Sequence, residues 1–237
     1  MPFTGKVALI TGASRGIGLA IARSLATEGC DLILTARHAS TLEKAGREVR
    51  RLGRKVLLQS CDVRDPDAVQ ALAAAVKKQF GRIDILVNNA GVAHPSLPVE
   101  KLLYKIWKKV VDTNLTGTFL VTHACLPLIK RGGVIVNNLS IAATQVFANS
   151  SAYCASKQGA LGLTSVLREE LRPRGIRVIA LLPGATDTDI WNALWPDAPR
   201  TKMMSAETVA SVVLSALEVP AQAAVEELKI LPATGTL

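Results

Sequence analysis

Short runs rich in Val, Ile and Leu alternate with longer segments of helical periodicity along nearly the whole chain. The apolar runs have the length of strands, and they fall at residues 6–10, 31–36, 55–60, 85–89, 133–140, 176–182 and 225–231. Helices are expected between them, up to about residue 27 and over about 40–52, 66–79, 99–130, 151–172 and 205–218. Nearly continuous apolar runs are typical of parallel strands covered on both faces. The alternation therefore predicts an α/β fold, a doubly wound parallel sheet of about seven strands with helices on both faces.

The composition agrees with one domain over residues 1–237. Only 4% of the residues are aromatic, so Val, Ile, Leu and Ala must fill the core. We see no linker, low-complexity run or repeat of fixed period. The Pro-containing stretch 183–200 is expected to be a loop over the site rather than a domain boundary.

The formal net charge of +9 raises nucleic acid, an anionic cofactor or an acidic protein as partners. The basic residues fall singly or in pairs along the predicted helices, without a nucleic-acid motif. This distribution is typical of solvated helix faces. We therefore expect no nucleic-acid partner.

Cysteine, histidine and hydropathy exclude several other classes of protein. The four cysteines are widely spaced and form no C-x-x-C motif, which indicates reduced thiols and a cytoplasmic location. The three histidines form no cluster with Cys or carboxylates at ligand spacing, so we expect no metal site. Because no run of about 18 residues is apolar throughout, neither a signal peptide nor a membrane span is expected.

A glycine-rich turn joins the first strand to the first helix. Gly12 permits the tight turn, Gly16 lets backbone N–H groups approach a pyrophosphate, and Gly18 allows close helix packing. The N-terminus of the following helix attracts negative charge, so the turn predicts a Rossmann-type dinucleotide site. The same turn matches the G-x-S-x-G nucleophile elbow of hydrolases around Ser14. Only one strand precedes Ser14 and the last histidine is His123, which argues against a hydrolase.

Four separated motifs occur in a fixed order along the chain. They are Thr11-Gly12-x-x-x-Gly16-x-Gly18, Asn88-Asn89-Ala90-Gly91, Ser140 thirteen residues before Tyr153, and Tyr153-x-x-x-Lys157, followed by Pro183-Gly184. In these motifs the chain resembles the classical short-chain dehydrogenases/reductases, especially 3-oxoacyl-carrier-protein reductases, over essentially its whole length. The resemblance implies an oxidoreductase that transfers a hydride between a nicotinamide cofactor and a carbonyl or secondary alcohol.

The expected catalytic residues are Asn114, Ser140, Tyr153 and Lys157. Tyr153 and Lys157 stand at i and i+4 and share one helix face. A free tyrosine has a pKa near 10, and a nearby lysine cation together with an oxidised nicotinamide would lower that pKa. By resemblance, Tyr153 protonates the carbonyl oxygen, Ser140 holds that oxygen, Lys157 also binds the nicotinamide ribose, and Asn114 holds a water of a proton relay. The alternative for Asn114 is an ordinary hydrogen bond to the helix backbone.

The resemblance also assigns the residues that contact the cofactor. The two residues after the third strand, Asp62 and Val63, are assigned to the adenine edge. After Pro183-Gly184 the chain has Thr186 where an apolar residue is usual, while Thr188 is expected to face the nicotinamide carboxamide. The full expected set is Gly12, Ser14, Arg15, Gly16, Ile17, Gly18, Arg37, Asp62, Val63, Asn89, Ala90, Gly91, Tyr153, Lys157, Pro183, Gly184, Thr186 and Thr188.

The end of the second strand predicts which nicotinamide cofactor is preferred. NAD enzymes of this fold carry an acidic residue there to accept the adenosine ribose hydroxyls. Here Ala36 takes that place and Arg37 follows, while Arg15 lies in the glycine turn. Two guanidinium groups that converge on a 2′-phosphate favour NADP(H) over NAD(H).

The sequence constrains the substrate less than it constrains the cofactor. A 3-oxoacyl thioester on an acyl carrier protein is one expectation by resemblance, with Arg131 and Arg174 expected near the mouth of the site. The same arginines could instead complement helix dipoles. Trp191 and Trp195 are interpreted either as an apolar lid or as a subunit contact.

The long helices predicted over 99–130 and 151–172 are expected to pair in a homodimer or homotetramer. Three alternatives to a carbonyl reductase stay open at this point. They are a dinucleotide-binding sensor that has lost catalysis, a nucleic-acid binder recruited by the net charge, and a sugar-nucleotide epimerase, which shares the Tyr-x-x-x-Lys motif. The intact Ser140, Tyr153 and Lys157 argue against the sensor.

Overall fold

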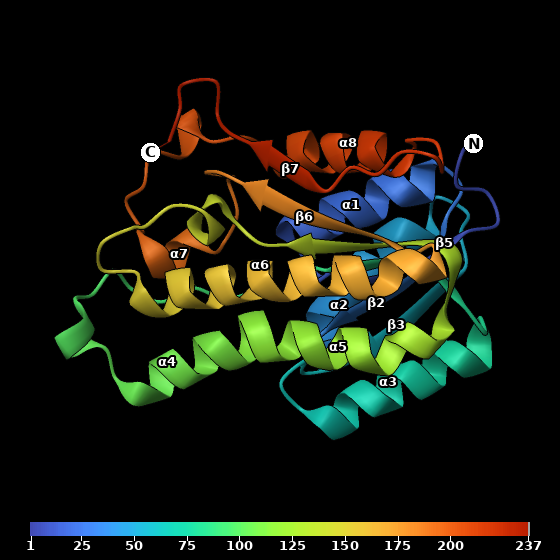
Figure 1. Ribbon diagram of the computed structural model, residues 1–237, viewed down its shortest axis with the longest axis horizontal. Helices are drawn as coiled ribbons and strands as arrows, with labels where there is room; N and C mark the ends of the chain where they lie inside the picture. Colours follow the sequence, from blue (N-terminus) through green and yellow to red (C-terminus); the bar gives the residue numbers. More distant parts are fainter. Residues whose placement is uncertain (237) are drawn as a thin grey trace.

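One parallel sheet of seven strands forms the centre of the protein (Figure 1). The computed structural model describes residues 1–236. The strands lie in the spatial order β3-β2-β1-β4-β5-β6-β7, and all neighbouring pairs are parallel. Their bounds are β1 Val7–Thr11, β2 Asp31–Ala36, β3 Val56–Ser60, β4 Ile83–Asn88, β5 Ile129–Asn138, β6 Arg177–Pro183 and β7 Glu227–Ile230. The order reverses between β1 and β4, and such a switch point leaves a crevice at the carboxyl ends of the strands.

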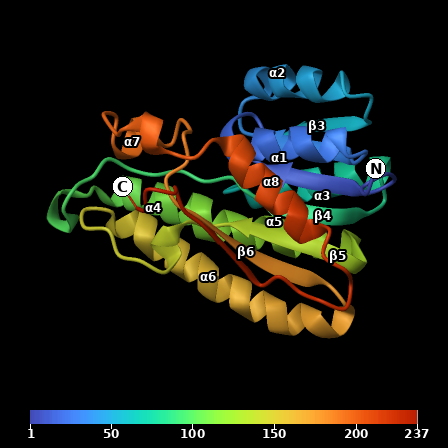
Figure 2. The same ribbon diagram turned by 90° about the horizontal axis from the view of Figure 1, so that it is seen from above.

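Helices cover both faces of this sheet (Figure 2). One layer contains α1, α2 and α8, and the other contains α3, α4, α5 and α6. The helix bounds are α1 Gly16–Thr27, α2 Ala39–Arg50, α3 Pro66–Gln79, α4 Tyr104–Val111, α5 Gly117–Cys125, α6 Ser151–Leu171, α7 Trp191–Leu194 and α8 Ala206–Leu217. The predicted doubly wound α/β fold is confirmed.

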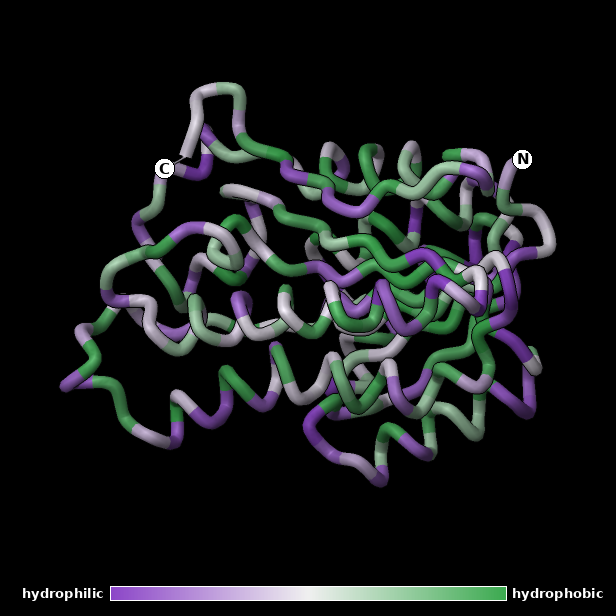
Figure 3. Tube along the Cα trace, viewed as in Figure 1, coloured by the Kyte–Doolittle hydropathy of each residue, from purple (hydrophilic) through white to green (hydrophobic). Residues whose placement is uncertain are grey.

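The core consists of two aliphatic layers, one on each face of the sheet. Successive strand side chains point to opposite faces, so Ala8 and Ile10 of β1 pack under α1 and α8, while Val7 and Leu9 pack on the other side. Figure 3 shows the same division, with hydrophobic chain in the sheet and hydrophilic residues along the outer helices. In residues 1–236 no helix combines the length and the apolar content that a membrane span requires.

The prediction of one long helix over residues 99–130 is wrong in its detail. A 3-10 turn at residues 99–101 precedes α4, a π-helical turn covers Asp112–Thr116, and α5 ends at Cys125. Pro127 stands in the 3-10 turn that follows, where the missing N–H and the proline ring oppose a longer helix. The fifth strand accordingly begins at Ile129 rather than at 133 and ends at Asn138, with an irregular register beside Gly132 and Gly133.

Arg131 and Arg174 lie at the opposite edge of the sheet from the crevice. Arg131 is near the start of β5, and Arg174 precedes β6, where its guanidinium donates a hydrogen bond of 3.2 Å to the Leu126 carbonyl. The amino ends of parallel strands share one edge, and the crevice lies at the other. The expectation that these arginines flank the mouth of the site is therefore wrong.

Candidate active site

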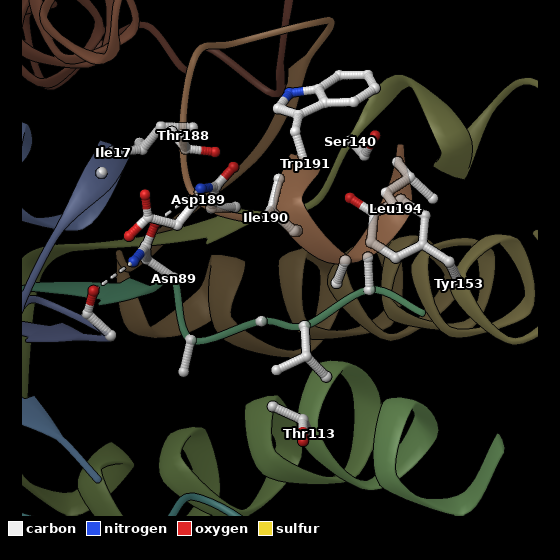
Figure 4. Close-up of a pocket in the computed structure, with 18 of the residues that line it drawn as sticks. Ile17, Asn89, Thr113, Ser140, Tyr153, Thr188, Asp189, Ile190, Trp191 and Leu194 are labelled. Atoms are coloured by element: carbon white, nitrogen blue, oxygen red, sulfur yellow. Dashed lines mark hydrogen bonds between the residues drawn. The ribbon is translucent and has the colours of Figure 1, made fainter. Parts of the chain in front are cut away.

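A cavity of about 850 Å³ lies along the carboxyl ends of the strands. Its wall brings together most of the residues that the sequence predicted, from the glycine turn, the NNAG motif, the end of β5, the start of α6 and the segment after β6 (Figure 4). Of the predicted residues, Gly18, Asp62 and Asn114 do not line it.

The glycine turn leaves no room for side chains. Gly12 has a φ of +62°, and a Cβ there would approach the Ala90 Cα to 2.9 Å. A Cβ on Gly18 would stand 2.6 Å from the Gly12 carbonyl oxygen and would overlap the Asn89 amide. Only glycine fits such positions, so the turn and the NNAG segment pack directly on each other.

The N-terminus of α1 opens toward the cavity. Arg15 is its N-cap residue but makes no side-chain cap, and the first turn contains no acidic residue. The first N–H groups of a helix lack partners within the helix, and Gly16 at φ +56° brings the backbone close to the wall. A free, positive helix end of this kind fits the pyrophosphate of a dinucleotide.

Asn89 braces the two halves of the crevice. Its Nδ2 donates to the carbonyls of Thr11 at 2.9 Å and Gly12 at 3.1 Å, and its Oδ1 accepts from Asn138 at 2.8 Å. Asn88 is buried below it, and its amide donates to Thr122. The NNAG motif therefore ties β1, β4 and β5 together at their carboxyl ends.

Ser140, Tyr153 and Lys157 come together at the inner part of the cavity. Ser140 follows β5, and the other two lie on the first turns of α6. The Lys157 Nζ lies 5.7 Å from the centre of the Tyr153 ring and donates a 3.0 Å hydrogen bond to the Asn138 carbonyl. The Ser140 Oγ accepts from the Ala142 N–H at 3.1 Å, and Ser140 lines the same part of the cavity as Tyr153.

Burial shifts the pKa values of both Tyr153 and Lys157. It raises the pKa of Tyr153, and the hydrogen bond from Ser140 offsets part of that rise. It also lowers the pKa of Lys157 to about 8. The predicted lowering of the Tyr153 pKa by Lys157 is not seen in the protein by itself. Tyr153 therefore holds its proton at neutral pH, which suits a proton donor.

Replacing Lys157 by Met is expected to stabilise the fold at neutral pH while it removes activity. Burial lowers the pKa of this lysine from an ordinary value of 10.5 to about 8, and its charge therefore costs folding on the order of 3 kcal/mol below pH 8. Methionine removes that cost but also the hydrogen bond to Asn138, worth about 1 kcal/mol.

The gain in Tm should be largest at neutral pH and should shrink as the pH rises from 8 toward 10.5, because Lys157 then becomes neutral in the folded state. Scanning calorimetry across this range measures it, with Lys105→Met, an exposed lysine on α4, as the matched control. A Lys157→Met variant that is less stable at every pH would contradict the argument.

Asn114 lies behind the wall, in the π-helical turn. Its Oδ1 accepts from the Val92 N–H, and its Nδ2 donates to the Val92 carbonyl at 2.9 Å and to Ser156 at 3.0 Å. A Cβ on Gly91 would lie 3.5 Å from the Asn114 Oδ1 and 3.7 Å from the Lys157 Nζ. The side chain thus fixes the segment after the NNAG motif. Whether Asn114 also holds a water stays a prediction.

The end of the cavity beside β2 and β3, where the adenosine of a dinucleotide is predicted to lie, carries Arg37 and Val63 on its wall. Arg15 also lines it, but its guanidinium pairs with the Asp189 carboxylate at 2.8 Å. Asp62 lies beside the cavity and pairs with Arg64, whose hydrogen bond holds the pKa of Asp62 below its ordinary value. Sequence patterns alone did not indicate Asp189, because its partner is 174 positions away.

The segment after β6 forms a lid over the cavity and includes α7. Thr186 is buried, bridges to Met204 and accepts a 2.9 Å hydrogen bond at its carbonyl from the Trp191 indole. Arg200 clamps the segment: it donates to the Asp187 carboxylate at 2.9 Å and to the carbonyl of Thr188 at 2.8 Å. This threonine also packs near Gly16, whose Cβ would meet it at 3.2 Å. Arg200 is a further residue that sequence reasoning missed.

No group of three or more His, Cys, Asp or Glu residues within the described chain is arranged to hold a metal ion. The residues that line the cavity are instead mainly apolar groups and hydrogen-bond donors. The glycine cradle, the open end of α1, the arginine at the end of β2 and the Tyr-Lys pair together fit a dinucleotide with one end in the adenosine region and the other beside Tyr153.

Comparison with known sequences agrees with this geometry. The model of the short chain dehydrogenase family matches residues 6–199. The D-threitol dehydrogenase of Mycolicibacterium smegmatis is 42% identical over 198 residues, which cover 83% of this chain and 75% of that protein. The 3-oxoacyl-(acyl-carrier-protein) reductase of Vibrio cholerae is 37% identical over 207 residues, covering 86% and 83% respectively.

Solved structures show the same fold. The alcohol dehydrogenase from the archaeon Thermococcus sibiricus complexed with 5-hydroxy-NADP superposes with a TM-score of 0.91 and 31% identity, over 98% of each chain. The carveol dehydrogenase from Mycobacterium avium in complex with NAD superposes with a TM-score of 0.86 and 29% identity, over 97% of each chain.

Proposed function

The chain belongs to the short-chain dehydrogenase family, and from this premise we propose that it uses NADPH to reduce a carbonyl group to a secondary alcohol. It is an oxidoreductase with a nicotinamide dinucleotide cofactor. The observation that carries the proposal is the position of Ser140, Tyr153 and Lys157 in the same cavity as the glycine turn. A panel of carbonyl compounds scored by the loss of NADPH absorbance tests it.

The protein's own residues would bind and protonate the carbonyl. When bound, the nicotinamide supplies a hydride to the carbonyl carbon. Tyr153 would donate its hydroxyl proton to the carbonyl oxygen as the C=O double bond becomes a single bond, so that the hydride and the proton together would convert the ketone to the alcohol and leave NADP⁺. Ser140 would hold the oxygen in place. The Lys157 cation would stabilise the tyrosinate that remains and so favour proton donation by Tyr153.

The preference for NADP(H) over NAD(H) rests on Arg37. It lines the adenosine end of the cavity, and Ala36 stands at the end of β2 where NAD enzymes of this fold carry an acidic residue. Arg15 would be a second partner for the 2′-phosphate. Its ion pair with Asp189 joins two exposed side chains, and such pairs are weak, so a phosphate dianion would compete for this guanidinium.

A 3-oxoacyl thioester is one candidate substrate of the proposed reaction, because the relative from Vibrio cholerae is named as a 3-oxoacyl-(acyl-carrier-protein) reductase. Carrier-protein docking at Arg131 and Arg174 is not part of the proposal, since both lie at the edge of the sheet away from the cavity. A free thioester belongs in the panel.

We expect the protein to form a homodimer or homotetramer. Large apolar side chains are exposed on the outer helices, with Tyr104 at 75%, Phe119 at 47% and Val166 at 54% of their surface accessible. A two-fold partner over α4, α5 and α6 would bury them. Light scattering should report a mass of at least twice the 25.1 kDa of one chain, and Phe119→Asp should lower it. A particle of one chain's mass at micromolar concentration would rule out the oligomer.

A further inference from the structure

Three segments of the chain form the part of the cavity around Ser140 and Tyr153. They are residues 92–96, residues 141–150 and residues 190–195, the last of which contains α7. Their lining side chains are almost all apolar: Val92, Ala93, Ile141, Ala142, Phe147, Ala148, Ile190, Trp191, Ala193, Leu194 and Trp195. Figure 4 shows Ile190, Trp191 and Leu194 in the same part of the cavity as Ser140 and Tyr153.

No Asp, Glu, Lys or Arg occurs in these three segments. Asp189, the acid on the cavity wall, is paired with Arg15, and the Lys157 ammonium donates to the Asn138 carbonyl. The other lysine on the wall, Lys109, lies on α4 and outside these segments. A charged group packed against the three segments would therefore lose its water without gaining an ionic partner from them, and that is costly.

Three aromatic side chains line this region and offer ring faces to a ligand. The Trp191 indole N–H already donates to the Thr186 carbonyl, so its remaining surface is apolar. Trp195 stands edge-on to Trp191 at 6.5 Å between ring centres and is 45% exposed. Phe147, from residues 141–150, adds a third ring to the lining. Flat rings of this kind pack well against another ring.

We propose that the substrate is an uncharged, apolar ring ketone, alicyclic or aromatic, whose carbonyl reaches Tyr153 while its ring packs against Trp191, Trp195 and Phe147. This inference rests on the proposed carbonyl reduction and names the class of its substrate. Polyhydroxylated ketones are disfavoured because, apart from Ser96 and Ser150, the side chains of the three segments that line the cavity offer no hydroxyl partner to several buried hydroxyl groups.

The test compares ketones of different polarity with the NADPH-loaded protein. The probes are 2-tetralone, cyclohexanone, the polyhydroxylated ketone L-erythrulose and the N-acetylcysteamine thioester of acetoacetate. We expect kcat/KM for 2-tetralone to exceed that for erythrulose by about 100-fold or more, since a missing hydrogen bond to a buried polar group costs about tenfold or more for each hydroxyl. A preference for erythrulose or for the thioester would overturn the substrate class and leave the proposed reduction intact.

A binding measurement separates failure of the substrate class from failure of the reaction. Isothermal titration of the NADP⁺-loaded protein with 2-tetralol and with threitol needs no turnover. Binding of 2-tetralol without that of threitol supports the class even if no ketone oxidises NADPH, in which case the proposed function itself fails. Tighter binding of threitol would refute the class.

Trp195→Ala tests the aromatic wall directly. Removing this ring should raise KM for 2-tetralone about tenfold and change KM for erythrulose little. Val146→Ala is the matched control, because Val146 is an exposed apolar residue in the neighbouring segment that does not line the cavity. Equal effects of Trp195→Ala on both ketones would contradict ring packing at this position.

Discussion

Replacing Tyr153 by Phe is expected to lower kcat by about 10²–10⁴-fold, the usual contribution of a positioned general acid. Phenylalanine keeps the ring at the start of α6 but removes the hydroxyl, which belongs to the same part of the cavity as Ser140. Because the hydroxyl lies beside the reacting end of the cavity, NADPH affinity should change little. Stopped-flow kinetics measures kcat, and fluorescence titration measures the affinity for NADPH.

The chain offers a matched control, since it has only two tyrosines. Tyr104 lies at the start of α4 and is 75% exposed, so Tyr104→Phe should keep wild-type activity. If Tyr153→Phe retained more than about a tenth of the wild-type rate, proton donation by Tyr153 would be refuted. A dinucleotide-binding sensor with little catalysis would then explain the fold better.

Replacing Arg37 by Asp is expected to reverse the cofactor preference. The change removes a partner of the 2′-phosphate and adds an acceptor for the ribose hydroxyls at the end of β2. Loss of one charged hydrogen bond should weaken NADPH binding by about 10–100-fold, while NADH binding should tighten. Fluorescence titration of both cofactors gives the two dissociation constants.

Arg51→Asp provides a control with the same change in net charge, because Arg51 is exposed at the end of α2 and lies outside the cavity. This variant separates a local contact from the general attraction of a basic protein for an anion. If the wild-type protein bound NADH as tightly as NADPH, the argument from Arg37 would be wrong before any substitution.

Local signals account for the parts of the fold that the sequence predicted best. The helix α3 has the predicted bounds, 66–79, because Asp65 caps it through the Asp67 N–H and Pro66 begins it. The glycine turn was equally readable, since strand, turn and helix are contiguous there. The motif residues of the site were predicted through their resemblance to a family, and the structure brings most of them to one cavity.

Tertiary contacts explain what the sequence could not reveal. The break at Asp112–Thr116 accompanies hydrogen bonds of Asn114 to Val92, which lies 22 positions earlier. Asp189 and Arg200 hold the lid through partners that no periodic pattern links to them. Arg131 and Arg174 were misplaced although both were predicted to precede strands, because the amino ends of parallel strands lie away from the crevice.

Transfer of a labelled hydride tests the central claim most directly. The protein is incubated with the best ketone of the panel and with NADPH that carries deuterium at C4, with the 4R and the 4S forms used separately. Mass spectrometry and NMR of the alcohol then show whether deuterium has reached the carbinol carbon. We predict one deuterium per molecule from one of the two forms and none from the other. An alcohol without deuterium from either form, or no alcohol from any ketone of the panel, would contradict the account.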